Sequence, residues 1–124
     1  LNPSKTGEFV RKMVMRYPQL HFDFHAHNDY DLAVANVYEA IKAGAKGVHV
    51  TLNGLGERAG NASLTSVLAL IHDHLNMKTS INENNVYYVS KVVESYSGVR
   101  ISKNMPIIGE NVFTQDLCQI VSIG

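Results

Sequence analysis

The sequence predicts an α/β fold built from two parallel βα units, and two observations carry that prediction. Apolar and polar side chains alternate over residues 20–27, which is the pattern of a half-buried strand, and a second short apolar strand follows at 47–52. The two strands start about 27 residues apart, close to the ~30 residues per repeat of a β/α barrel of about 250 residues. Other parallel α/β sheets have a similar repeat, so the spacing alone leaves both architectures open.

Four helices are expected around and after these strands. Asn2 is placed to cap the first helix and Pro3 to occupy its first position, and Pro18 stops it. Gly44 and Gly98 follow apolar-periodic segments and are natural helix terminators. The predicted helices cover residues 3–17, 32–43, 64–75 and 86–97.

The number of predicted strands limits what the chain is by itself. Two parallel strands are marginal in isolation, and parallel sheets normally have both faces covered. The 124 residues do not supply the further strands of a complete parallel α/β domain. We therefore expect the chain to be a fragment of a larger domain.

The amino-acid composition and net charge indicate which classes of binding partner to expect. The chain is 45% hydrophobic and 18% charged with zero formal net charge, so nothing in its electrostatics favours nucleic acid or an anionic membrane, and neither is expected as a partner. No apolar run approaches the ~20 residues of a membrane helix. The single Cys118 has no partner for an internal disulfide, which fits a cytoplasmic protein.

The first candidate site lies where the first predicted strand ends. His25 and His27 are two residues apart, so their side chains point to the same face of the strand. Parallel α/β folds place their active sites at the C-terminal ends of their strands. Two imidazoles in that position are suited to hold one divalent cation. The alternative is a pair of exposed or hydrogen-bonded histidines, and the residues alone leave both interpretations open.

A glycine-rich loop at residues 53–61 follows the second predicted strand. Asn61 offers an amide oxygen to a hard cation, and Glu57 and Arg58 are candidates for substrate binding. Thr51, on the strand, is a candidate substrate-contacting hydroxyl. The alternative is an ordinary βα turn, in which Asn61 caps the next helix and Glu57 and Arg58 pair at the surface.

Together the two motifs resemble those of a known family. The segments His25-Ala26-His27-Asn28-Asp29 and Gly56-Glu57-Arg58-Ala59-Gly60-Asn61, at this spacing, resemble the 2-isopropylmalate, citramalate and homocitrate synthases. Those enzymes are metal-dependent TIM barrels that condense acetyl-CoA with a 2-oxo acid. The resemblance runs to about Gln115, and residues 106–115 are most like the citramalate and some isopropylmalate branches.

The resemblance implies a fold and a domain division. Residues 20–27 and 47–52 would be the last two strands of an eight-stranded TIM barrel. Residues 1–80 would belong to that barrel, and residues 81–115 would form a helix and an extended linker toward a second subdomain. Residues 116–124 form a divergent tail.

The resemblance also implies site residues and ligands. His25, His27 and Asn61 would be three ligands of a divalent cation (Zn²⁺, Mn²⁺, Co²⁺ or Mg²⁺). Asp29 would join Thr51, Glu57 and Arg58 in binding substrate or orienting those ligands. Acetyl-CoA would be the co-substrate and a 2-oxo acid its acceptor, in an acyltransferase of leucine or isoleucine biosynthesis that forms a homodimer.

Parts of the family's site have no counterpart in this sequence. The family's fourth ligand is an Asp on the first barrel strand, which is absent here together with the substrate-binding arginine beside it. The proton-transfer histidine of the following subdomain is not found after Gln115, so no catalytic residue is assigned. We expect the chain alone to be inactive.

Two alternatives stand beside this interpretation. The strand-end His-x-His pattern is also similar to that of metal-dependent amidohydrolase barrels, although those barrels usually place it on the first strand and the glycine-rich loop would then have no role. The other alternative is a non-catalytic, truncated remnant.

Overall fold

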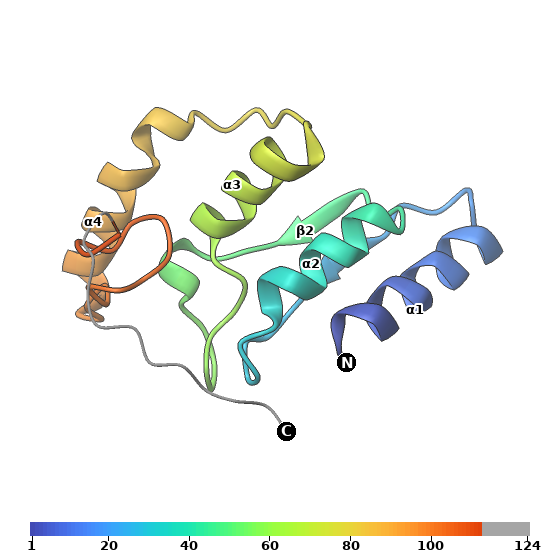
Figure 1. The fold of residues 1–124 in the computed structure, drawn as a ribbon, viewed down its shortest axis with the longest axis horizontal. Helices are drawn as coiled ribbons and strands as arrows, with labels where there is room; N and C mark the ends of the chain where they lie inside the picture. The colour runs from blue at the N-terminus through green and yellow to red at the C-terminus, as the bar shows by residue number, and fades with distance from the viewer. Residues whose placement is uncertain (113–124) are drawn as a thin grey trace, which may run out of the picture.

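The computed structural model describes residues 1–112, and the expected divergent tail at 116–124 lies outside the described residues. Three helices precede or alternate with two short strands, and a fourth helix follows them (Figure 1). Two short 3₁₀ turns, Leu52–Gly54 and Glu83–Asn85, interrupt the connections. The helices and strands are α1 (Pro3–Arg16), β1 (Asp23–His25), α2 (Ala33–Lys42), β2 (Gly47–His49), α3 (Leu64–Leu75) and α4 (Val86–Ser97).

The predicted helix boundaries are confirmed to within one residue, because their capping signals are local. The Asn2 side chain accepts a hydrogen bond from the Lys5 backbone N–H at 2.9 Å, and Pro3 begins α1. At the end of the last described helix, Gly98 ends α4 with a φ of 71°, the left-handed conformation that glycine adopts without strain.

The two strands pair in parallel, with Asp23 opposite Gly47 and His25 opposite His49. Both are shorter than predicted. The first was expected from residue 20 to 27 and the second from 47 to 52, but regular pairing covers only three residues of each. Alternation in the sequence marks residues able to form a strand, whereas the paired length is set by the neighbouring strand.

The helices α1, α2 and α3 lie on one face of this sheet, and the core forms between them (Figure 1). Phe24 and Val48, from the middle of each strand, pack against the residues of α2 and α3. A second cluster joins α1 to α2. The buried apolar residues of the two clusters are Val10, Ala26, Ala33, Val37, Ala40, Ala43, Ala62 and Val67.

The opposite face of the sheet carries polar side chains. His21 and Asp23 were expected to line the interior of a sheet or barrel and to depend on neighbours outside the chain. In the structure they pair with each other, with His21 Nε2 at 2.7 Å from Asp23 Oδ1, and both side chains are exposed. Gly47 allows this, because a Cβ there would lie 2.1 Å from Asp23 Oδ1.

The segment after α4 is not the extended linker that was predicted. Residues 103–112 fold into successive tight turns, in which Gly109 N–H donates to the Met105 carbonyl at 2.9 Å and Asn111 N–H to that of Lys103 at 2.8 Å. Ile108 becomes only 5% exposed as a result. The prediction was wrong because Pro106 and Gly109 favour turns over extended chain.

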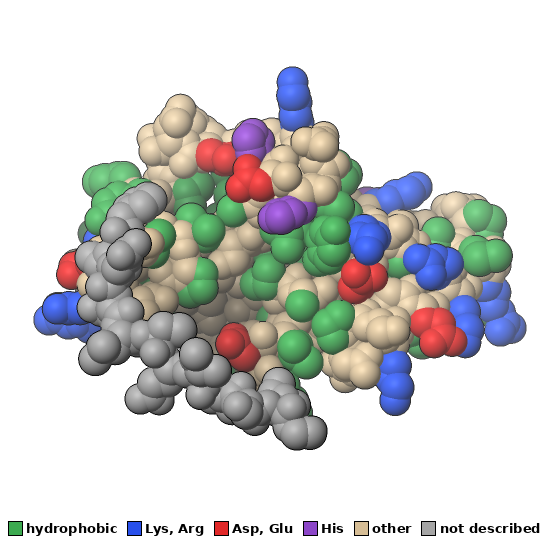
Figure 2. All heavy atoms as spheres, in the orientation of Figure 1, with side chains coloured by type: hydrophobic (Ala, Val, Ile, Leu, Met, Phe, Trp, Pro, Cys, Tyr) green, Lys and Arg blue, Asp and Glu red, His purple; other side chains and the backbone are tan. Residues whose placement is uncertain are grey.

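Charge and apolar surface are unevenly spread over the molecule. Figure 2 shows Lys and Arg side chains gathered over α1, with acidic side chains among them, and hydrophobic side chains over the middle of this face. Two tyrosines of α4 are also exposed, Tyr88 by 70% and Tyr96 by 89%. Within residues 1–112, no helix has the length and apolar character needed to cross a bilayer.

Candidate metal centre

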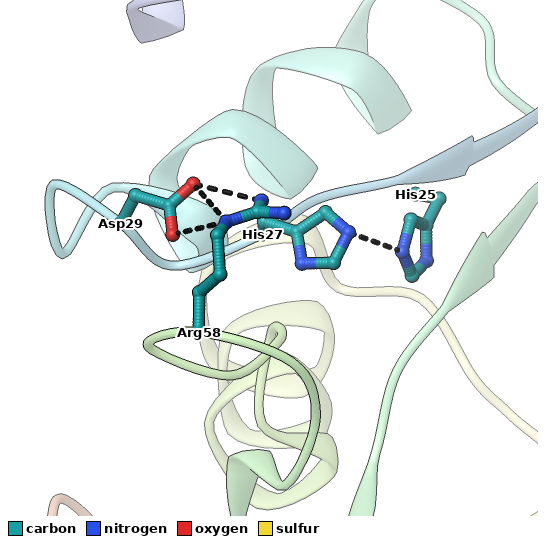
Figure 3. Close-up of polar contacts among 4 residues, drawn as sticks. All are labelled: His25, His27, Asp29 and Arg58. Atoms are coloured by element: carbon teal, nitrogen blue, oxygen red, sulfur yellow. Dashed lines mark hydrogen bonds and ion pairs between the residues drawn. The ribbon is translucent and has the colours of Figure 1, made fainter.

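His25 and His27 face each other at the end of β1. Their Nε2 atoms are 3.3 Å apart, and the two rings are perpendicular with centroids 4.9 Å apart (Figure 3). Two nitrogen ligands of one tetrahedral ion, each ~2.1 Å from it, lie about 3.4 Å apart. The pair therefore has the separation of two ligands of one ion. The same separation also permits a hydrogen bond between the rings, which was the alternative left open.

Asn61 lies beside this pair through the backbone. His27 and Asn61 form an isolated antiparallel bridge. The Asn61 Nδ2 donates to the Leu55 carbonyl at 3.0 Å, while Asn61 Oδ1 is buried without a hydrogen-bond partner in the described chain. A buried amide oxygen with no partner is unfavourable unless something binds it, so this oxygen is free to accept a hydrogen bond or to act as a metal ligand.

The residues around Asn61 hold the loop against the end of β1. Asn28 N–H donates to the Gly60 carbonyl at 2.9 Å, and Ala62 N–H to the Ala26 carbonyl at 3.2 Å. Gly60 has a φ of 86°, and a Cβ there would lie 2.0 Å from the Gly54 carbonyl oxygen, so no side chain fits. These bonds place the loop against the end of β1 and the residues that follow it, which carry His25 and His27.

Asp29 and Arg58 form an ion pair across the same junction. Arg58 Nε donates to the two carboxylate oxygens of Asp29 at 2.9 and 3.2 Å, and its NH2 group donates to Oδ2 at 2.9 Å (Figure 3). The Arg58 guanidinium hydrogen-bonds the carboxylate and so lowers the pKa of Asp29. Arg58 therefore pairs with Asp29, and the alternative in which it pairs with Glu57 at the surface does not describe the structure.

The structure gives no contact between the histidine pair and the candidates Thr51 and Glu57. The Thr51 hydroxyl donates to the Leu55 carbonyl at 2.6 Å, so it closes the local turn. Glu57 is exposed, and its carbonyl accepts from Gly60 N–H within the loop. Asn61 does not cap α3, because the capping position belongs to Ser63. Only Asp29 and Arg58 contact each other among the four supporting residues.

The donors present fit a divalent cation. The described part of the chain has no group of three or more His, Cys, Asp or Glu side chains arranged for a metal. The predicted set instead combines two imidazole nitrogens with one amide oxygen, and of these His25 and His27 face each other while Asn61 Oδ1 has no hydrogen-bond partner among the described residues. Mixed nitrogen and oxygen ligation suits Zn²⁺, Mn²⁺ or Co²⁺.

Two asparagines of these segments, Asn28 and Asn53, were assigned no role from the sequence. Asn28 Oδ1 accepts from Ala33 N–H at 3.1 Å and so caps α2 from five residues upstream. Asn53 Nδ2 donates to the Ser90 carbonyl at 2.9 Å, which ties the loop to α4. Asn28 follows the His-x-His motif directly, so its position in the sequence could have indicated a role at the site. The partner of Asn53 lies 37 residues away, and nothing near Asn53 in the sequence indicates that contact.

A cavity of about 650 Å³ lies behind the loop, between the N-terminal ends of α2 and α3 and the turns after α4. Asparagine and serine side chains dominate its wall, and Asp31 is the one charged residue among the described residues that line it. The other polar residues that line it are Asn28, Asn53, Asn61, Ser63, Ser66, Ser102 and Asn104.

Comparison with known families shows which family the chain belongs to. Residues 1–93 match the family model described as HMGL-like. The chain belongs to the HMGL-like family. The matched range contains the whole of the histidine, asparagine and ion-pair cluster, and the family suggested by the two motifs is confirmed.

Curated relatives of this HMGL-like chain carry synthase names. The chain is 44% identical over 114 residues to a protein of Archaeoglobus fulgidus named probable 2-isopropylmalate synthase, covering 92% of this chain and 22% of the relative. It is 42% identical over 113 residues to a homocitrate synthase of Saccharolobus solfataricus, covering 91% and 24%. The chain thus spans about a quarter of the length of these relatives.

Solved structures confirm the fold. An HMG-CoA lyase of Acinetobacter baumannii, determined with coenzyme A and 3-methylmalate, matches 95% of this chain and 40% of its own with a TM-score of 0.75 at 20% identity. An HMG-CoA lyase of Bacillus subtilis matches 86% and 38% with a TM-score of 0.73 at 21% identity. The chain is a part of the TIM-barrel fold of these neighbours, as predicted.

Proposed function

We propose that this HMGL-like chain is the part of an acetyl-CoA-condensing synthase that supplies three ligands of its divalent cation. The condensation joins the methyl carbon of acetyl-CoA to the keto carbon of a 2-oxo acid. Synthase names among relatives at 42–44% identity support the reaction class. The facing imidazoles, the unpartnered Asn61 oxygen and the backbone bridge between His27 and Asn61 support the site.

His25 and His27 would bind the cation as neutral imidazoles through Nε2, and Asn61 through Oδ1. A cation held there would polarise the keto group of the 2-oxo acid toward attack. The backbone bonds of Asn28 and Ala62 and the bridge between His27 and Asn61 keep the asparagine beside the segment that carries the histidines, where the three side chains would bind one ion. Asp29 and Arg58 support this arrangement from one side.

The observation that carries the proposal is the buried and unpartnered Asn61 Oδ1. A hydrogen-bonded histidine pair alone would explain the contact between the rings, but it leaves this oxygen without a function. The amidohydrolase alternative makes no use of the glycine-rich loop that presents it. A cation bound by two imidazoles and this oxygen accounts for all three atoms.

Finer assignments remain proposals of the same kind. We propose 2-isopropylmalate or citramalate synthesis in leucine or isoleucine biosynthesis, in the cytoplasm and as a homodimer. Residues 1–80 would lie in the barrel, and residues 81–115 would lead toward a second subdomain. The first-strand Asp, its neighbouring arginine and the proton-transfer histidine are not in this chain, so we expect it to be inactive alone.

The test uses the complete protein that contains these residues. Acetyl-CoA is supplied with pyruvate, 2-oxoisovalerate or 2-oxoglutarate, and free CoA is measured with a thiol reagent before and after chelation of metal. We expect CoA release with one of these acids, its loss on chelation, and a decrease of at least about 100-fold in His25→Ala, His27→Ala and Asn61→Ala.

The matched control is His72→Ala. This histidine is also exposed and hydrogen-bonded, with Nδ1 at 2.7 Å from Asp73 Oδ1, but it lies near the end of α3. Its activity should equal that of the unchanged protein. CoA release that survives chelation, or a loss of activity in the control as large as in the three ligand variants, would contradict the proposal.

A further inference from the structure

The Asp29–Arg58 ion pair joins the two segments that carry the candidate ligands. Asp29 lies two residues after His27, and Arg58 lies three residues before Asn61. The two residues are 29 positions apart in the sequence, so their contact links separate segments and is not a local turn. Three donor–acceptor distances of 2.9 to 3.2 Å describe a two-pronged guanidinium–carboxylate contact, which fixes orientation as well as distance.

The backbone of Arg58 adopts a conformation that favours glycine. Its φ is 56°, in the left-handed region where glycine is the favoured residue and where the loop already has Gly54 and Gly60. A long β-carbon-bearing residue is held there against its conformational preference. In the described structure, the Arg58 side chain makes its hydrogen bonds and its ion pair with Asp29. That ion pair therefore explains why an arginine occupies a position that favours glycine.

The pair is also exposed, which bears on what it does. The side chains of Arg58 and Asp29 are 56% and 41% exposed, and exposed ion pairs contribute little to folding stability. A general stabilising role is therefore a poor explanation for a strained arginine. Closing one particular loop over one strand end is a role that such a pair performs well.

We propose that the Asp29–Arg58 ion pair is a positioning device that holds the Gly56–Gly60 loop on the strand end, so that Asn61 stays bridged to His27 and its Oδ1 can bind the same cation as the imidazoles of His25 and His27. Neither member of the pair binds the cation. This inference rests on the proposed function, because it concerns the affinity of the same site for its metal.

The test is a double-mutant cycle on Co²⁺ binding in the complete protein, followed by titration calorimetry and by the visible absorption of bound Co²⁺. Arg58→Asn is the main variant, because asparagine tolerates the left-handed backbone and only the guanidinium is lost. It is measured with and without Asn61→Ala. Lys12→Gln, which removes the exposed Lys12–Glu8 pair of 2.7 Å in α1, is the matched control.

We expect Arg58→Asn to weaken Co²⁺ binding about 10-fold, as losses of groups that orient metal ligands commonly do. In the Asn61→Ala background the same change should alter affinity less than about 2-fold, because the ligand that it positions is already gone. The swapped variant Asp29→Arg with Arg58→Asp should recover most of the affinity. Lys12→Gln should bind Co²⁺ as the unchanged protein does.

The outcomes separate the two proposals. Absence of Co²⁺ binding to the unchanged protein overturns the proposed function itself. If the unchanged protein binds Co²⁺ and Arg58→Asn binds it equally well, the positioning role is wrong while the metal site stands. An equal weakening by Arg58→Asn with and without Asn61 also overturns the inference, because the pair would then act on the site by another route.

Discussion

Gly56 and Asn61 occupy the same small space within the glycine-rich loop. A Cβ built on Gly56 would lie 2.0 Å from Asn61 Nδ2 and 2.9 Å from its Cγ, so the amide packs directly against the glycine backbone. Non-bonded heavy atoms do not lie less than 3.0 Å from a Cβ, so a side chain at this position would displace the amide. The absence of a side chain at position 56 therefore sets where the Asn61 amide lies, and with it the buried oxygen of the candidate metal centre.

Gly56→Ala should consequently displace the Asn61 amide and weaken Co²⁺ binding about 10-fold or more. The change is measured by calorimetric titration, with far-UV circular dichroism to check the fold. Gly98→Ala is the control: its φ of 71° is also positive, but an added Cβ would meet no heavy atom within 4 Å. It should lower stability by about 1 kcal/mol and leave the metal affinity unchanged. Equal affinity in Gly56→Ala would contradict the role of this glycine.

The helices and the histidine pair were predictable because their signals are local. The Asn2 cap, the Gly98 terminator and the apolar period each lie within a few residues of the element they define. The facing of His25 and His27 follows from the two-residue repeat of a strand. Each of these predictions needed only the chain's immediate neighbourhood.

The rest depended on contacts between distant segments. Nothing near Arg58 in the sequence indicates that its partner is Asp29 and not the adjacent Glu57, because that choice follows from the parallel pairing of the two strands. Thr51 has a hydroxyl suited to a substrate, but the turn brings the Leu55 carbonyl within 2.6 Å of it. The prediction of strand length was wrong for the same reason, because the length of each strand depends on its pairing with a strand that is distant in the sequence.

Val37 tests the core between α2 and the sheet. It is fully buried in the main apolar cluster. Val37→Ala removes two methyl groups and leaves a cavity, so unfolding free energy should fall by about 2 kcal/mol. Val99→Ala, at a position that is 52% exposed, should change it by less than about 0.5 kcal/mol. Denaturant titration of both variants measures the difference, and equal effects would show that α2 is not packed as described.

Asn2 tests the first helix cap. Its side chain oxygen accepts the Lys5 N–H at 2.9 Å, which satisfies one of the free donors at the start of α1. Asn2→Ala should destabilise the protein by about 1 kcal/mol in a denaturant titration, while Asn2→Ser should retain most of the stability. Similar losses in both variants would indicate that the cap is not what stabilises this end.

Glu94 tests how the turns after α4 are attached to that helix. Its carboxylate accepts a hydrogen bond from the Ile101 backbone N–H, and this bond lowers the pKa of Glu94 below its ordinary 4.5. A carboxyl whose pKa is lower in the folded state stabilises the fold above its ordinary pKa, and that contribution disappears as the pH falls through the lowered value. Unfolding free energy should therefore fall more steeply between about pH 6 and about pH 3 in the unchanged protein than in Glu94→Gln, which lacks the titrating group. Parallel pH curves for the two proteins would show that the carboxylate does not hold the turns, because the lowered pKa requires the Ile101 contact.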